Sequence, residues 1–277
     1  MASIRANARP NVVGASFGSL WLLITIVPIY YIVVTSLRPR SDYYSENPLS
    51  LPANPTLQAY QDVLAANFGM YFMNSVFVTA TSVVTVVFVS LLAAYVIVRN
   101  QSRFSMRMFN VLLLGIAIPL QGVIIPVYYL IVKLGLYDTL WAIILPAIAF
   151  AIPITVLILV NFLRDVPNEL FESMRIDGAT DWRMLWTLVV PLTKPAIITV
   201  AIYDALNVWN GFLFPLILTQ SSDKRVLPLS LWTFQGAFTT NIPAVLAAVV
   251  LSVLPMLAAY AVGRRQLVSG LTAGFSK

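Results

Sequence analysis

The chain alternates long apolar stretches with shorter polar ones, and six of the apolar stretches are long enough to cross a lipid bilayer. A helix needs about 20 apolar residues to do so, because each backbone amide must find its partner within the segment. The six spans are expected at about residues 17–37, 70–98, 108–132, 139–162, 195–218 and 243–262. The pattern therefore predicts an all-α integral membrane protein with six transmembrane helices in a single transmembrane domain, residues 1–277.

The composition supports a membrane location and removes most catalytic chemistry. The 277 residues are 59% hydrophobic and only 10% charged, whereas about 25% of the residues in an ordinary soluble domain are charged. The chain has no cysteine and no histidine, so it lacks a thiol nucleophile, an imidazole base and the commonest metal ligands. We expect no catalytic residue, no metal site and no cofactor bound by this chain.

The basic residues indicate how the chain is oriented. The net charge of +6 fits membrane orientation better than nucleic-acid binding, because the arginines and lysines lie between the apolar spans. On one face lie Arg5, Arg9, Arg99, Arg103, Arg107, Arg164, Arg175, Arg183, Lys194, Arg264, Arg265 and Lys277, and on the other lie Arg38, Arg40, Lys133, Lys224 and Arg225. The positive-inside rule then places both termini, including a tail at residues 264–277, in the cytoplasm.

Two features near the ends of spans leave alternatives open. The first span follows Arg5 and Arg9 and could be a signal peptide, but it is long and no small-residue cleavage site follows it. The outer segments at residues 38–68, with four prolines, and 221–242, with mixed polar and aromatic residues, are either simple connectors or functional loops.

The inner loop at residues 164–191 carries the strongest local pattern. Asp165 and Pro167 predict a helix start, and Gly178 predicts its end, because glycine readily adopts the left-handed conformation of many helix termini. A second short helix is expected from Thr180 or Asp181. Both helices are amphipathic and would lie across the cytoplasmic face, either on lipid headgroups or in a groove of a partner protein. Three arginines and five carboxylates between residues 164 and 186 make the loop acidic, which favours a protein partner.

The same loop resembles the EAA loop of ABC importer permeases, whose pattern is E-A-A, three residues, G, nine residues and I-x-L-P. Residues Glu172, Ser173 and Met174 stand at the E-A-A positions, Gly178 at the glycine and Pro191 at the proline. Serine and methionine replace the two usual alanines, and both remain compatible with a helix. The runs 176–179 (IDGA) and 191–195 (PLTKP) are similar to those of the MalG-like carbohydrate importer group, the binding-protein-dependent transport inner membrane components.

Further short motifs of that group follow in order along the chain. They are Asn54-Pro55-Thr56-Leu57 with Tyr60, Ile118-Pro119 with Ile125-Pro126, Trp209-Asn210 with Pro215-Leu216, and the tail residues Gly270 to Gly274. The resemblance implies a type I ABC importer permease fold, import of a disaccharide, oligosaccharide or sugar derivative, and a place in a bacterial inner or plasma membrane. The implied partners are a MalF-like second permease, a MalK-like ATPase dimer, an extracytoplasmic sugar-binding protein and membrane lipid.

The resemblance also implies which loop residues couple transport to ATP hydrolysis. Glu172, Asp177 and Gly178 would act in the cleft of an ATPase subunit, with Ser173, Met174, Ala179 and Pro191 at neighbouring motif positions. Asp177 could instead cap the following helix. The sequence has no G-x-x-x-x-G-K-[ST] run, so ATP and magnesium are expected in the partner ATPase.

Polar residues within the fifth and third spans are candidates for a substrate pathway. Asp204 is the one ionisable residue deep in a span, and a carboxylate there needs a cavity or a partner. Asn207, Trp209 and Asn210 follow it and could bind sugar hydroxyls and ring faces, or could join helices by hydrogen bonds. Gln121, between Pro119 and Pro126, marks a possible gate in the third span.

Two other classes of protein compete with the importer subunit. A secondary transporter would use Asp204 as its ion-coupling carboxylate, and it would be expected to contain repeat-related halves, which the sequence does not show. A membrane enzyme would need a paired acid and base, whereas the spans contain one carboxylate.

Overall fold

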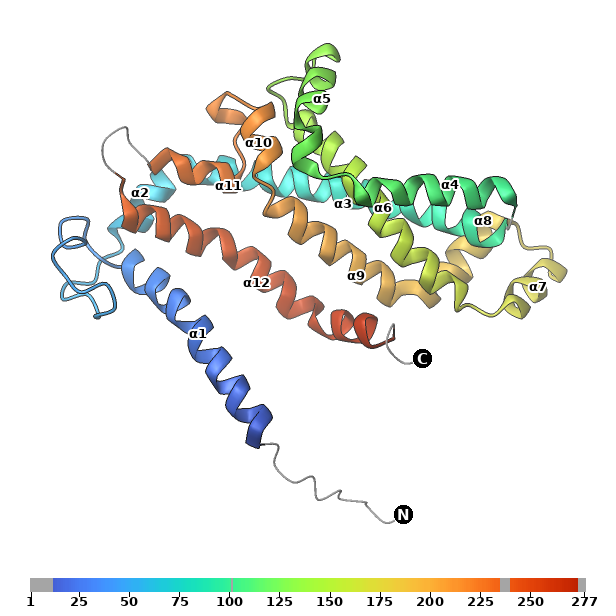
Figure 1. Cartoon of the computed structure of the whole chain (residues 1–277), viewed down its shortest axis with the longest axis horizontal. Helices are drawn as coiled ribbons and strands as arrows, with labels where there is room; N and C mark the ends of the chain where they lie inside the picture. The colour runs from blue at the N-terminus through green and yellow to red at the C-terminus, as the bar shows by residue number, and fades with distance from the viewer. Residues whose placement is uncertain (1–11, 101, 235–239, 274–277) are drawn as a thin grey trace. The chain divides into compact units, whose positions relative to one another are not determined.

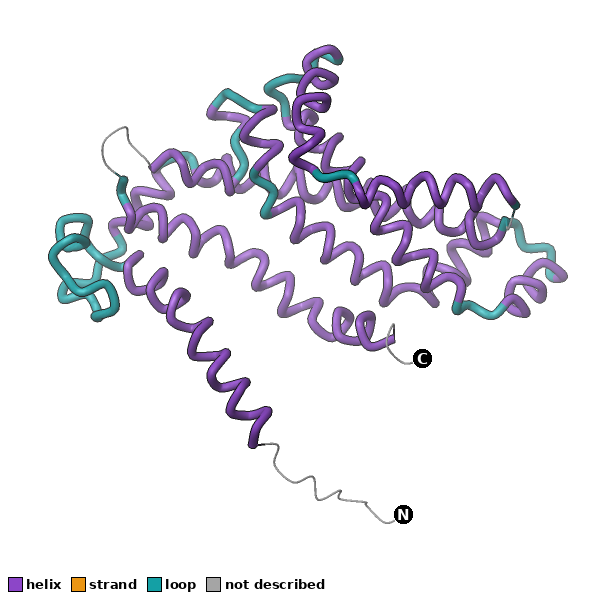
Figure 2. The backbone as a smooth tube through the Cα atoms, viewed as in Figure 1, coloured by secondary structure: helices purple, strands orange, loops and turns teal. Residues whose placement is uncertain are grey.

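The structure is a computed structural model that describes residues 12–100, 102–234 and 240–273, and its elements are helices joined by turns and loops (Figure 2). Arg5, Arg9 and Lys277 lie outside the described residues. The longer helices are α1 (Val12–Ser36), α3 (Phe68–Arg99), α4 (Arg103–Leu114), α5 (Leu120–Lys133), α6 (Leu140–Arg164), α9 (Val190–Trp209) and α12 (Ile242–Ala273). The shorter elements are α2 (Gln58–Ala65), η1 (Gly115–Ala117), α7 (Asn168–Ile176), α8 (Asp181–Met184), η2 (Leu185–Val189), α10 (Leu213–Leu218), η3 (Ser222–Lys224), α11 (Leu227–Ser230) and η4 (Leu231–Phe234).

Five helices of the described chain are long and apolar enough to cross a membrane, and a bent pair makes a sixth if it counts as one span. The bent pair covers the third span, expected at residues 108–132, and the bend falls at the prolines that interrupt this span. Residues Arg103–Ala117 and Leu120–Lys133 meet at an angle of 105°. Pro119 lies at the bend, and a β-carbon on Gly115 would approach Pro153 Cγ of α6 to 2.8 Å. The chain bends where proline removes an amide donor and glycine permits close packing.

The fifth and sixth spans also differ from their expected bounds. The fifth helix begins at Asp181, runs through α8, η2 and α9 to Trp209, and stops there, whereas one span was expected at residues 195–218. α10 is a separate short helix after this break. α12 continues to Ala273, so most of the predicted tail at 264–277 belongs to a helix, and residues 274–277 lie outside the described part.

Contacts between Cα atoms divide the chain into two units, and the single domain stays a prediction. The first unit contains Met1–Ala66 and Trp232–Leu251. Within it, Arg38 is 1% exposed, and its guanidinium group donates to the backbone carbonyl groups of Asn47 and Ser50. The Nε atom of Arg38 lies 3.4 Å from Glu46 Oε2. This arginine, two residues after the end of α1, therefore organises the loop to which it belongs.

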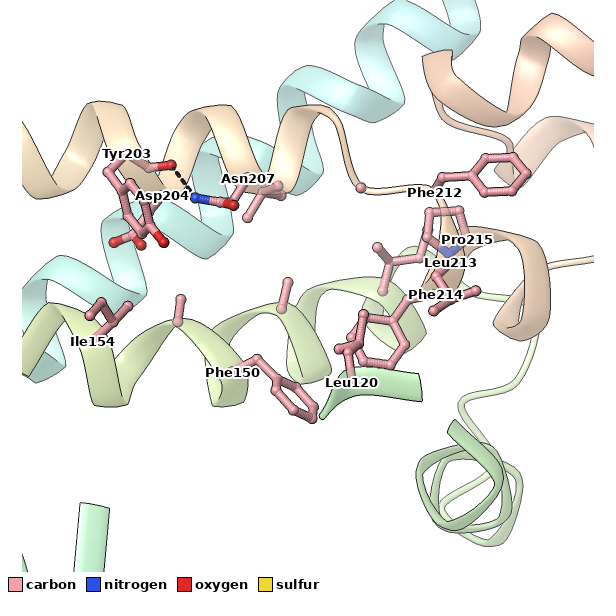
Figure 3. A pocket seen from close by; sticks show the side chains of 15 residues that line it. Leu120, Phe150, Ile154, Tyr203, Asp204, Asn207, Phe212, Leu213, Phe214 and Pro215 are labelled. Atoms are coloured by element: carbon pink, nitrogen blue, oxygen red, sulfur yellow. Dashed lines mark hydrogen bonds between the residues drawn. The ribbon is translucent and has the colours of Figure 1, made fainter. Parts of the chain in front are cut away.

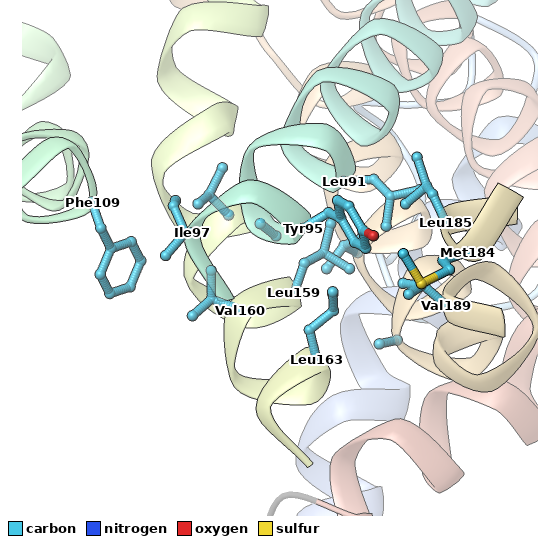
Figure 4. Packing of buried hydrophobic residues seen from close by; sticks show 14 of the residues in the cluster. Leu91, Tyr95, Ile97, Phe109, Leu159, Val160, Leu163, Met184, Leu185 and Val189 are labelled. Atoms are coloured by element: carbon cyan, nitrogen blue, oxygen red, sulfur yellow. The ribbon is translucent and has the colours of Figure 1, made fainter. Parts of the chain in front are cut away.

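The second unit contains Asn67–Leu231 and Ser252–Lys277, and its centre is formed by α3, α6 and α9, which pack side by side (Figure 1). Its largest apolar cluster joins α3, α4 and α6 to the loop that follows α6 (Figure 4). Leu91 and Tyr95 of α3, Leu159 of α6 and Met184 and Leu185 of the loop contribute to it. Phe171, Met184 and Leu185 of the short loop helices are thus buried in the core of this unit, whereas Trp182 and Trp186 are exposed.

Candidate functional site

The loop after α6 forms a tight elbow between two short helices. α7 ends at Ile176, and Gly178 follows with φ +75°. The Ala179 N–H donates to Met174 O (2.9 Å) and the Gly178 N–H donates to Arg175 O (3.1 Å). These two bonds define a Schellman motif, in which the residue at the Gly178 position must take the left-handed conformation. We call residues 168–181 the coupling elbow.

The second arm of the coupling elbow is continuous with a membrane helix. The Thr180 hydroxyl caps α8 by accepting a hydrogen bond from the Arg183 N–H (3.3 Å). From Asp181 the helix continues through the π-helical turn η2 into α9 and reaches Trp209 without a break. A displacement of the coupling elbow would therefore be carried along one helix into the membrane.

Two side chains of α3 hold the coupling elbow. Tyr95 Oη donates to Asp181 Oδ1 (3.1 Å), and Arg99 Nη1 donates to Asn168 Oδ1 (3.0 Å). The Arg99 guanidinium also lies 4.1 Å from the centre of the Phe171 ring, within the range of a cation–π interaction. We call Tyr95 and Arg99 the α3 clamp. The sequence did not predict this clamp, whose local signs are a tyrosine and an arginine one helical turn apart at the end of a span.

The predicted coupling residues divide between the two faces of the elbow. Met174 and Ala179 are half-buried against the apolar cluster, beside the buried Phe171. The exposed residues are Glu172, Ser173, Asp177, Gly178 and Pro191. Asp177 occupies the C-cap position of α7, and the cap of the following helix is Thr180, so the capping role considered for Asp177 belongs to Thr180.

A cavity of about 280 Å³ lies between α6, α9 and the segment after α9. Asp204, Asn207 and Tyr203 of α9 face it together with Phe150 of α6 and Phe214 of α10 (Figure 3). The Asn207 amide nitrogen donates to Tyr203 O (2.8 Å), which leaves the amide oxygen of this exposed side chain as an acceptor. The cavity thus combines two polar groups with aromatic walls.

Asp204 both borders the cavity and joins two helices. It is 1% exposed, and Thr155 Oγ1 of α6 donates to its Oδ2 atom (2.9 Å). Its Oδ1 atom is buried and has no hydrogen-bond partner among the described residues. The carboxylate therefore has both the cavity and the partner between which the sequence left the choice open. Thr155 was not singled out in the sequence, where it is one hydroxyl in an apolar span.

The other pathway candidates are not among the residues that line this cavity. Trp209 is buried, donates from Nε1 to Ser252 O (3.1 Å) and packs edge-on against Phe72 with 5.9 Å between ring centres. Asn210 is exposed and donates to Leu206 O (2.8 Å), and Gln121 is exposed near the start of α5. Trp209 acts in packing here, and the roles of Asn210 and Gln121 in a pathway stay predictions.

A polar clasp lies at the opposite end of α6 from the coupling elbow. Asp138 precedes α6 and accepts hydrogen bonds from the Gln220 N–H (2.8 Å), the Ser221 N–H (2.9 Å) and the Ser221 hydroxyl. These bonds hold the pKa of Asp138 below its ordinary value of 3.8. The largest cause is the hydrogen bond from the Ser221 hydroxyl. Neither short segment carries a motif, so the sequence did not predict this pairing. Within the described residues, no group of three or more acidic residues could hold a metal ion.

Comparison with known proteins assigns the family. The model of the family described as the binding-protein-dependent transport system inner membrane component matches residues 86–267. The chain belongs to this family. It is 38% identical over 94% of its length to a Caldicellulosiruptor protein named as an ABC transporter permease, of which it covers 95%. It is 32% identical to a diacetylchitobiose uptake system permease of Streptomyces coelicolor, with 92% of this chain and 85% of that protein covered.

Solved structures share the fold of this transport component. A bacterial ABC transporter involved in the import of alginate matches with a TM-score of 0.81 at 21% identity, covering 96% of this chain and 99% of that chain. The prediction of an ABC importer permease and of its fold is thereby confirmed. The chain is a multi-pass membrane protein, and its family does not favour the ion-coupled transporter built on Asp204.

Proposed function

We propose that the chain is the membrane-spanning subunit through which an ABC importer carries a disaccharide, an oligosaccharide or a sugar derivative. The relatives support the substrate class, because their names refer to diacetylchitobiose in Streptomyces coelicolor and to multiple sugars in Streptococcus mutans. The latter relative is 31% identical, with 92% of this chain and 93% of that protein covered.

The observation that carries the proposal is the division of the coupling elbow into a buried and an exposed face. Phe171, Met174 and Ala179 fix the elbow to the core, while Glu172 and Asp177 remain exposed to a partner. Such an arrangement suits an amphipathic helix that is anchored on its own subunit and inserted in a groove of another. Glu172, Ser173, Asp177 and Gly178 would enter the cleft of an ATPase subunit, and Pro191 would lie just behind it.

ATP hydrolysis in that partner would move the coupling elbow. Two connections lead from the elbow to the membrane helices of this chain. One is the continuous helix from Asp181 to Trp209, and the other is the α3 clamp. Both lead toward the helices beside the cavity at Asp204 and Asn207. In this account the cavity is a part of the sugar pathway, in which Asn207 and the aromatic walls would contact sugar hydroxyls and ring faces.

The proposed assembly has this chain beside a second permease subunit, with an ATPase dimer on the cytoplasmic side and a sugar-binding protein on the other. ATP and magnesium would bind only to the ATPase dimer. The excess of basic residues on the face of the coupling elbow supports the cytoplasmic placement of that face and of both termini.

Reconstituted vesicles test the proposal directly. Vesicles that contain the chain with its permease, ATPase and binding-protein partners should accumulate radiolabelled diacetylchitobiose, or the sugar that the cognate binding protein retains, when ATP is supplied. Uptake should continue after ionophores collapse the proton and sodium gradients, and the Asp204→Asn variant should remain ATP-dependent. Uptake by this chain alone, or uptake that follows an ion gradient without ATP, would contradict the proposal.

A further inference from the structure

A second cavity lies behind the coupling elbow, at the end of two membrane helices. It measures about 270 Å³ and is bordered by the last residues of α3 and α6, the first turn of α4 and the start of α7. α3 ends at Arg99 and α6 ends at Arg164, so the cavity lies where the membrane spans stop. A bilayer changes at that depth from acyl chains to phosphate headgroups.

The walls of the cavity match an amphiphile. Ile97, Met106 and Leu163 provide apolar surface, whereas Arg164 and Asn168 provide hydrogen-bond donors. Arg164 is exposed, and its guanidinium lies 5.8 Å from the centre of the Phe109 ring. An arginine held over an aromatic ring at headgroup level keeps its remaining N–H groups available for a phosphate oxygen.

The charges around the cavity favour an anion. Arg103 and Arg107, both exposed, lie on α4 within one turn of Met106, and Arg99 contacts Asn168 and Phe171, which line the cavity. Arg99 Nε is buried and has no hydrogen-bond partner among the described residues. The nearby carboxylates are Asp165, which follows Arg164, and Glu169 in the first turn of α7. The segments that border the cavity thus carry four guanidinium groups, of Arg99, Arg103, Arg107 and Arg164, and two carboxylates, of Asp165 and Glu169.

We infer that this cavity binds one anionic phospholipid, with the phosphate at Arg164 and an acyl chain against Ile97, Met106 and Leu163. The lipid would be in contact with Phe171 and Asn168, the two residues of the coupling elbow that Arg99 holds. The lipid composition of the membrane would therefore affect the stability of the elbow through Asn168 and Phe171, which line the cavity, and not through the exposed Glu172 and Asp177. The inference needs only that the chain spans the membrane, and it stands whether or not sugar is the transported molecule.

Native mass spectrometry of the detergent-purified complex tests this binding. Titration with phosphatidylglycerol should give saturable retention of one lipid, and phosphatidylcholine should be retained more weakly. Arg164→Gln should weaken phosphatidylglycerol binding about fivefold, which corresponds to about 1 kcal/mol for one basic side chain near a membrane surface. Lys133→Gln, which removes an exposed positive charge at the end of another membrane helix, is the matched control and should leave binding unchanged.

A second variant keeps the test decisive if loss of Arg164 prevents insertion. Met106→Trp fills the apolar part of the cavity without changing any charge, and it should also lower retention of phosphatidylglycerol. Inorganic phosphate, which has no acyl chain, should not displace the lipid at millimolar concentration. Unchanged binding in both variants, equal retention of the two lipids, or displacement by inorganic phosphate would overturn the inference.

Discussion

Gly178 is the residue at which the backbone of the coupling elbow is most constrained. Its φ of +75° costs a residue with a β-carbon roughly 1–2 kcal/mol. A β-carbon would meet no atom within 4 Å, so the constraint is conformational and not steric crowding. This position was predictable from the sequence, because a glycine at the end of an amphipathic helix is a common helix terminus.

Substitution at Gly178 should separate coupling from insertion. We expect Gly178→Asp to abolish uptake while the subunit still inserts and assembles, because the new side chain strains the turn and adds negative charge at the docking face. Gly178→Asn should retain part of the activity, since asparagine strains the turn about as much as aspartate does but adds no charge. Uptake by membrane vesicles, compared at equal amounts of inserted protein, measures this. Normal uptake by Gly178→Asp would remove the elbow from the mechanism.

Asp138 gives a pH dependence with a defined sign. Because the pKa of Asp138 is lowered in the folded protein, the clasp to Ser221 and Gln220 stabilises the fold above the ordinary pKa of 3.8, and this contribution is lost as the pH falls toward the folded pKa. Thermal unfolding between about pH 5 and about pH 3 should show a loss of stability in the parent protein that Asp138→Asn lacks. Parallel curves for the two proteins would show that the clasp contributes nothing.

The sequence did not predict the residues whose hydrogen-bond partners lie far away along the chain. Thr155 lies 49 residues before Asp204, and Ser221 lies 83 residues after Asp138. No local pattern links such partners, because their proximity depends on how the helices pack. The motif positions of the coupling elbow were predictable because their spacing within one loop is itself the pattern.

At the scale of helices, length and hydropathy located the membrane segments but not their breaks. The third span bends by 105° between η1 and α5, and the fifth helix stops at Trp209 before α10. Apolar residues continue across the first break, and at the second only Asn210 and Gly211 interrupt them, so hydropathy over a whole span does not mark either break. Pro119 and Gly211 stand at the breaks, yet Pro126, Pro146 and Pro153 lie within helices that continue, so such residues alone do not predict a break.

The α3 clamp makes a prediction that differs from simple loss of the fold. Arg99→Ala combined with Tyr95→Phe removes the hydrogen bonds to Asn168 and Asp181 and the contact with the Phe171 ring. We expect uptake to fall at least about tenfold, the factor that corresponds to 1.4 kcal/mol of lost coupling, while the complex continues to hydrolyse ATP. The ratio of sugar transported to ATP hydrolysed measures this loss.

The conservative variant Arg99→Lys should give an intermediate ratio, because lysine keeps the charge but lacks the planar group that stacks on the Phe171 ring. A proportional fall of uptake and ATP hydrolysis in the double variant would indicate that the α3 clamp only supports assembly. Uptake and ATP hydrolysis that both stay at the level of the parent protein in that variant would show that the α3 clamp does not transmit motion.

For the whole molecule, the orientation in the membrane can be tested by labelling single introduced cysteines, because the chain contains no cysteine of its own. Ser222→Cys and Glu169→Cys each place one thiol at an exposed position, on η3 and on α7. A membrane-impermeant maleimide should label Ser222→Cys in intact cells and should label Glu169→Cys only after the membrane is permeabilised. The reverse pattern would invert the topology that the distribution of arginines and lysines predicts.

The central claim is that the coupling elbow docks on an ATPase subunit, and site-specific crosslinking in the assembled transporter tests it most directly. A single cysteine at Ser173, on the exposed side of α7, should crosslink this chain to the ATPase through a short bifunctional reagent. The same reagent on Ser222→Cys should give no such product. If cysteines placed along residues 169–178 never crosslink to the ATPase in any nucleotide state, and remain fully accessible in the active complex, the claim is contradicted.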